Sequence, residues 1–121
     1  MTIHYFIDSL KNCKCSSPNV EAIEELYHTE FPPELTSIIS KMNETIFFEG
    51  VDFARLLSFQ EVLDANDDLN VDFIGIKIVP LIDLGDNDYL SYDLKNKRWC
   101  KFNIVDEISF SIKDKLQDYF D

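Results

Sequence analysis

The stretch from Ile76 to Phe102 reads IKIVPLIDLGDNDYLSYDLKNKRWCKF, and it guides the interpretation of the whole chain. Three apolar runs are separated by two polar breaks, at Gly85–Asp88 and at Lys95–Lys97. Apolar runs bounded by turn-forming residues are typical of antiparallel strands joined by short turns. The stretch therefore predicts a three-stranded meander. Pro80 has no N–H for the ladder, so we expect it at a strand start, a bulge or an edge.

Helical spacing of apolar residues dominates on both sides of this meander. Residues recurring at i, i+3, i+4 and i+7 indicate one buried face of a helix. This spacing predicts helices over residues 2–12, from Ser17-Pro18 onward, and after Phe31-Pro32-Pro33, where Leu35, Ile38, Ile39 and Met42 recur. The same spacing of Ile108, Ile112, Leu116 and Tyr119 predicts a C-terminal helix that begins at Asp106 and runs nearly to the end of the chain.

Shorter elements are expected between the helices and the meander. Ile46–Phe48 and Val51–Leu57 read as two short strands. Ser58 and Glu61 form a capping-box pattern, in which each side chain reaches the other residue's backbone amide. The helix that follows is expected to end in a loop at Ala65–Asp68, because Asn and Asp accumulate there. Together, these elements predict an α+β fold with an antiparallel sheet of four to six strands packed against several α-helices.

Length and charge restrict the possible functions. With 121 residues, 1–121 suits a single domain. The net charge of −12 argues against nucleic acid and anionic membranes as partners, and it favours a partner with a basic surface. An acidic surface that only keeps the protein soluble is the alternative. Met1–Leu10 lacks a basic region followed by an apolar run, and no segment is long enough to span a bilayer, so we expect a cytoplasmic protein. We expect a monomer or a weak homodimer.

Candidates for metal binding and catalysis are weak. The three cysteines, Cys13, Cys15 and Cys100, have neither a disulfide framework nor a zinc spacing. The carboxylates at Asp83–Asp88 suggest calcium, but the EF-hand register fails, since position six is Asp88 and position twelve is Leu94. A solvated turn is the simpler interpretation. There is no phosphate-binding glycine loop and no nucleophile elbow, so we expect no metal, no cofactor and no enzymatic activity.

Acidic and aromatic side chains on the meander are the candidate contacts for a protein partner. Aromatic residues with a polar atom are frequent anchors of interfaces, and carboxylates would meet a basic partner. The candidates are Asp83, Asp86, Asp88, Tyr89, Asp93 and Trp99. The alternative for Trp99 is a core position, because aromatic side chains also dominate cores.

Three segments of this chain resemble the SUKH superfamily, a group of small α+β proteins that includes immunity proteins of bacterial polymorphic toxin systems. The first runs from Leu26 through Phe31-Pro32-Pro33-Glu34-Leu35 to Ile39, and the second from Leu56 to Val62. The most specific is Val79–Leu94, with its Val-Pro-Leu and Gly-Asp-x-Asp-Tyr-Leu-x-Tyr-Asp-Leu pattern. The family commonly carries an Asn-Gly-Gly-like turn where this chain has Asn43-Glu44-Thr45.

The resemblance implies a function in binding rather than catalysis. It implies an intracellular immunity protein that neutralises a cognate toxin domain, such as a basic nuclease, by occlusion. Two alternatives stay open at this point. One is a regulatory protein-interaction module without a toxin partner, and the other is a hydrolase that uses clustered carboxylates.

Overall fold

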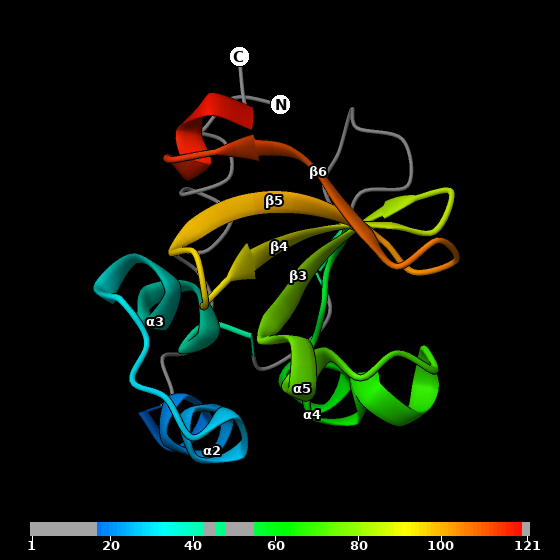
Figure 1. Cartoon of the computed structure of the whole chain (residues 1–121). Helices are drawn as coiled ribbons and strands as arrows, with labels where there is room; N and C mark the ends of the chain where they lie inside the picture. Colours follow the sequence, from blue (N-terminus) through cyan, green and yellow to red (C-terminus); the bar gives the residue numbers. More distant parts are fainter. Residues whose placement is uncertain (1–16, 43–45, 48–54, 120–121) are drawn as a thin grey trace.

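The computed structural model describes residues 17–42, 46–47 and 55–119, which form one α+β domain (Figure 1). An antiparallel sheet is packed against several helices. The helices are α2 (Ser17–Tyr27), α3 (Pro33–Ile39), α4 (Phe59–Asp68), α5 (Phe73–Ile76) and the 3-10 helix η1 (Leu116–Tyr119). The strands are β1 (Ile46–Phe47), β2 (Arg55–Leu56), β3 (Ile78–Gly85), β4 (Asp88–Asp93), β5 (Arg98–Asn103) and β6 (Ile108–Lys113).

The predicted meander is confirmed. The strands lie in the order β1-β2-β3-β4-β5-β6, and each pairs antiparallel with its neighbour in the chain. Pro80 lies within β3, where the register shifts between Pro80 and Ile82. A bulge tolerates proline because it already interrupts the ladder hydrogen bonds. The position of Pro80 therefore agrees with the expectation from its missing N–H.

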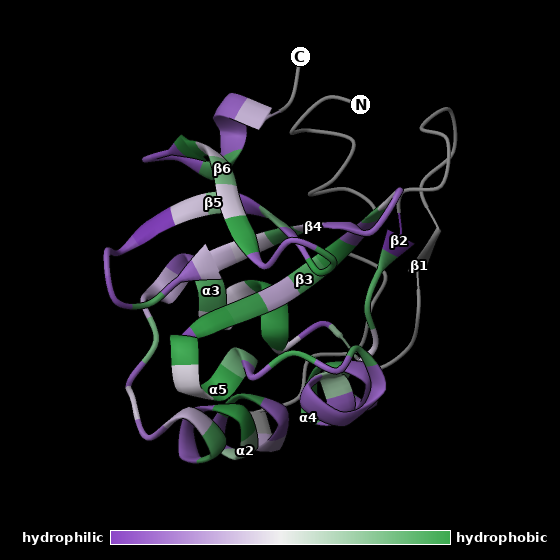
Figure 2. Ribbon diagram, turned by 45° about the vertical axis from the view of Figure 1, so that its right-hand side comes forward, coloured by the Kyte–Doolittle hydropathy of each residue, from purple (hydrophilic) through white to green (hydrophobic). Residues whose placement is uncertain are grey.

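Helices α2, α4 and α5 gather on one side of the sheet, while η1 lies beyond β6 (Figure 1). Figure 2 shows hydrophobic residues concentrated on β3 and α5, whereas α4 is mostly hydrophilic. The predicted apolar face of α3 is confirmed, since Leu35, Ile38, Ile39 and Met42 are all buried. Tyr27 of α2 is buried as well, and its hydroxyl donates a hydrogen bond to the Ile78 carbonyl at 2.8 Å. This bond ties α2 to the start of β3.

The capping box at the start of α4 is also confirmed. The Glu61 amide donates to the Ser58 hydroxyl at 3.2 Å, and the Ser58 amide donates to the Glu61 carboxylate at 3.1 Å. Helix α4 continues through Asp68, so the prediction of a loop from Ala65 was wrong. Val62 and Ala65 are buried against the rest of the fold, and this packing outweighs the turn preference of the Asn and Asp residues.

The predicted C-terminal helix from Asp106 is wrong. Residues Ile108–Lys113 form the strand β6, and only Leu116–Tyr119 are helical, as the short η1. The apolar residues Ile108, Phe110 and Ile112 also alternate with a period of two, which suits a strand. Pairing with the edge of β5 decides between the two patterns, because it satisfies backbone groups that a surface helix would leave unpaired on β5.

Some predicted elements lie outside the described residues. These are the helix over residues 2–12, the residues 48 and 51–54 of the two short strands, and the turn at 43–45. None of the helices within the described residues has the length and apolar character needed to cross a bilayer.

We expect Ser58→Ala to lower the free energy of unfolding by about 1 kcal/mol, because it removes the hydroxyl that caps α4. Urea unfolding followed by circular dichroism measures this change. The matched control is Ser37→Ala at an exposed position of α3, which should change stability by less than about 0.5 kcal/mol. Equal stability of the two variants would contradict a stabilising role for the capping box.

Candidate functional site

The predicted contact residues fall at several different places in the structure. Asp83 and Tyr89 are opposite one another on β3 and β4, Asp86 lies in the turn that joins these strands, and Asp88 is the first residue of β4. Asp93 lies at the other end of β4. Trp99 is a separate case, because its side chain is in the interior.

Trp99 is a core residue. It is only 1% exposed, and its ring meets that of Tyr92, the residue opposite on β4, edge to face at 5.0 Å between ring centroids. The fold therefore decides between the two interpretations of Trp99 that the sequence left open. Its side chain offers no surface to a partner.

The β3–β4 turn presents Asp86 on a rigid two-residue loop. Gly85 is paired with Asp88, and the two residues between them, Asp86 and Asn87, have φ angles of 53° and 68°. Asp and Asn tolerate this left-handed backbone, which the tight turns of hairpins require. The Gly85 amide donates to the Asp83 carboxylate at 2.9 Å, and the Asn103 side chain donates to Asp88 at 2.9 Å. The carboxylate-rich loop is thus a hairpin turn.

The β5–β6 turn lies beside the β3–β4 turn and adds two further acidic residues. The Ile104 amide donates to the Asn87 carbonyl at 3.0 Å, which joins the two turns. Both turns lie at the same end of the sheet in Figure 1. Asp106 and Glu107 are exposed there. We call this region the acidic end, and it comprises Asp83, Asp86, Asp88, Asp106 and Glu107.

Sequence reasoning missed Asp106 and Glu107 because it placed residues 106–120 in a helix. The period-two alternation of Ile108, Phe110 and Ile112 was the signal that could have found the turn. Asn103 supports that turn, since its side-chain oxygen accepts from the amides of Val105 and Asp106 at 3.0 and 2.9 Å.

The opposite end of the sheet carries exposed cations. We call it the basic end, and it comprises Lys77, Lys95, Lys97 and Arg98, of which Arg98 forms an ion pair with Asp114 at 3.3 Å. Asp93 also lies here, about 17 Å from Asp88 along β4 at the usual rise per residue. Its carboxylate accepts from the amides of Lys95 and Asn96 and from the Asn96 side chain, so it shapes the β4–β5 turn. Asp93 is therefore not part of the acidic end.

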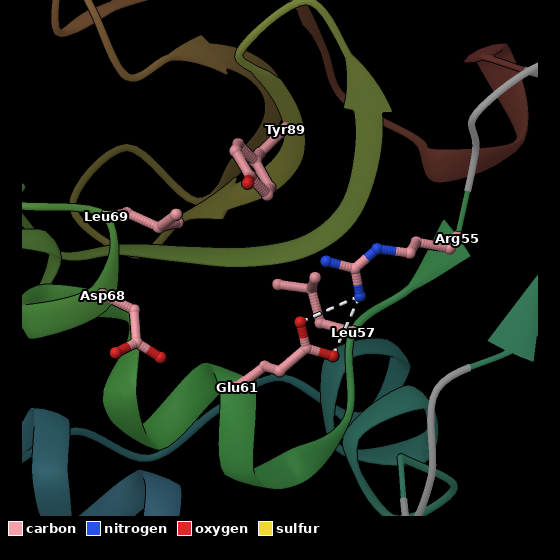
Figure 3. Close-up of a pocket in the computed structure, with 6 residues that line it drawn as sticks. All are labelled: Arg55, Leu57, Glu61, Asp68, Leu69 and Tyr89. Atoms are coloured by element: carbon pink, nitrogen blue, oxygen red, sulfur yellow. Dashed lines mark hydrogen bonds and ion pairs between the residues drawn. The ribbon is translucent and has the colours of Figure 1, made fainter.

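A small pocket of about 50 Å³ adjoins the acidic end, between β2, α4 and β4 (Figure 3). Arg55 donates to both carboxylate oxygens of Glu61 at 2.9 and 2.8 Å, and it lies 3.5 Å from the Asp83 carboxylate. Figure 3 shows Arg55 turned toward Glu61, with Tyr89 on the opposite wall. Arg55 thus holds β2, β3 and α4 together through its two acidic partners.

This pocket has little capacity for catalysis. Its volume is far below the roughly 300 Å³ or more typical of ligand sites. Burial, together with the charge of Asp83, raises the pKa of Tyr89, so the phenol stays protonated. Glu61 and Asp83 are both occupied by Arg55. No group of three or more His, Cys, Asp or Glu side chains suited to a metal ion occurs within the described residues.

Comparisons with known proteins assign no role to these residues. No protein-family model matches this chain, and no curated protein matches it. Any role of the acidic end therefore has to be argued from its geometry and charge.

We expect Cys100 to resist alkylation in the folded protein. Burial raises the pKa of its thiol from 9.0 to about 11, which lowers the reactive thiolate fraction about 100-fold at pH 8. Iodoacetamide labelling at pH 8, read by mass spectrometry of the peptide that contains Cys100, tests this expectation. The same protein in urea is the control, and labelling at similar rates in both states would contradict the buried position.

Proposed function

We propose that this chain is an immunity protein that binds a cognate toxin domain with a basic surface and neutralises it by occlusion. The observation that carries this proposal is the grouping of exposed carboxylates on two adjacent turns at one end of the sheet, whereas Lys77, Lys95 and Lys97 lie at the other end. The resemblance to SUKH proteins supplies the biological setting.

The geometry of the acidic end suits recognition of a protein. Asp86, Asp106 and Glu107 are exposed on turns that backbone hydrogen bonds and the Asn103 side chain hold in place. A turn whose backbone is already ordered loses little backbone freedom when a partner binds. A net charge of −12 also accelerates encounter with a basic partner and repels phosphate. A nuclease suits this role, because a surface that binds a phosphate backbone is basic.

The contacts of the carboxylates Glu61 and Asp83 also agree better with a binding function than with catalysis. A carboxylate-based hydrolase needs two carboxyl groups that face a substrate cavity. Glu61 and Asp83 instead engage Arg55, and the adjoining pocket of about 50 Å³ is far smaller than a typical ligand site.

Co-expression with the candidate toxin tests the proposal. The candidate is the large protein with a variable C-terminal domain encoded next to this chain's gene, if the locus carries one. We expect cell survival and a co-purified complex when both proteins are present. Survival no better than with the toxin alone would overturn the immunity role, whereas a stable complex without protection would indicate a regulatory interaction module.

We expect the triple variant Asp86→Asn, Asp106→Asn, Glu107→Gln to weaken toxin binding by about tenfold, because three exposed charges contribute roughly 0.5 kcal/mol each. Isothermal titration at several salt concentrations measures the change, and the salt dependence should also become shallower.

The matched control removes three negative charges from exposed positions on the helices α2 and α3, through Glu21→Gln, Glu25→Gln and Glu34→Gln. This control should bind within about threefold of the wild type, since its charges lie away from the acidic end. Equal losses in the two triple variants would show that only the net charge matters, and not the acidic end.

A further inference from the structure

The strand β6 exposes apolar side chains at the edge of the sheet. Ile108 and Ile112 are 52% and 54% exposed, and Phe110 is exposed between them. Among the described residues, β6 pairs on one side only, with β5. Unpaired edges with apolar residues are templates for the addition of another strand.

The two halves of β6 differ in how open this edge is. From Phe110 to Lys113 the strand advances three residues, while the facing part of β5 advances two, from Lys101 to Trp99. The extra residue makes a bulge, and Ser111 lies in it with a φ of 50°. Bulges and lysines are the usual means of blocking an edge. Ile108–Phe110 is therefore the open half.

The open half is continuous with the acidic end. Asp106 and Glu107 are exposed and directly precede Ile108. An extended segment on this edge would thus meet backbone donors and acceptors, two apolar side chains and a group of carboxylates. Complementary charge selects a basic segment.

We propose that the partner adds a basic, extended segment as a short strand along Ile108–Phe110, with its cationic side chains toward Asp106 and Glu107. This inference rests on the proposed function, and it specifies how the toxin domain is held. Main-chain hydrogen bonds provide the attachment in this mode of recognition, and alternate side chains provide the selectivity. A second copy of this chain fits less well, because both copies carry a charge of −12.

A short peptide of alternating lysine and valine tests the mode of binding without the toxin. Fluorescence anisotropy measures its affinity, and hydrogen exchange read by mass spectrometry locates it on the chain. We expect slower exchange in the segment 108–110 when the peptide is bound. A peptide of the same sequence with N-methyl groups on alternate amides keeps its charge but loses one edge of hydrogen bonds, so it should bind at least about tenfold more weakly.

Ile108→Ser and Ile112→Ser provide a matched pair, because they change the same residue type at similar exposure on either side of the bulge. We expect Ile108→Ser to weaken peptide binding several-fold and Ile112→Ser to leave it unchanged. Equal affinity of the plain and N-methylated peptides, or equal effects of the two substitutions, would overturn strand addition at this site.

The proposed function and this inference can fail separately. The chain could protect cells while hydrogen exchange in the segment 108–110 is equally fast with and without the toxin domain. That result would retain the immunity role and overturn strand addition. Without any peptide, hydrogen exchange in that segment could become slower as the protein concentration rises. That result would assign the edge to a second copy of the chain and overturn the proposal.

Discussion

The burial of β4 on both faces is the constraint on which the rest of the structure depends. Leu90 and Tyr92 point to one face of this strand and Tyr89 and Ser91 to the other, yet all four are buried. A strand in the middle of a meander needs cover on both faces when both carry apolar side chains. The helices provide part of that cover, and the Tyr27–Ile78 hydrogen bond fixes α2 against the start of the neighbouring strand β3.

The separation of charge follows from the same topology. Consecutive antiparallel hairpins place alternate turns at opposite ends of the sheet. The β3–β4 and β5–β6 turns therefore share one end, and their sequences are acidic, while the β4–β5 turn at the other end carries Lys95 and Lys97. Arg55 partly neutralises the negative charge of Asp83. The exposed negative charge of this end is therefore concentrated on Asp86, Asp106 and Glu107. The open half of β6 begins where this group ends.

Local sequence signals were sufficient where a few neighbouring residues decide the structure. The capping box of Ser58 and Glu61 and the Asp86-Asn87 turn are set by side chains that bond to nearby backbone, so the sequence predicted both. The stretch 106–120 was mispredicted because its apolar spacing fits a period of two as well as a helix. As a consequence, the prediction of the candidate site omitted Asp106 and Glu107, and it included Trp99, which is buried.

The sequence by itself determined the α+β class, the meander, the position of its turns and the acidic character of the chain, because composition and short-range periodicity specify these properties. Only the tertiary structure decided that β6 is a strand, that Trp99 lies in the core, and that Asp93 is separated from Asp86. Each of these depends on what lies beside the residue in space. Pairing with β5, packing against Tyr92 and the alternation of turns between the ends of the sheet bring together residues of different strands, and the periodicity within one segment does not specify such contacts.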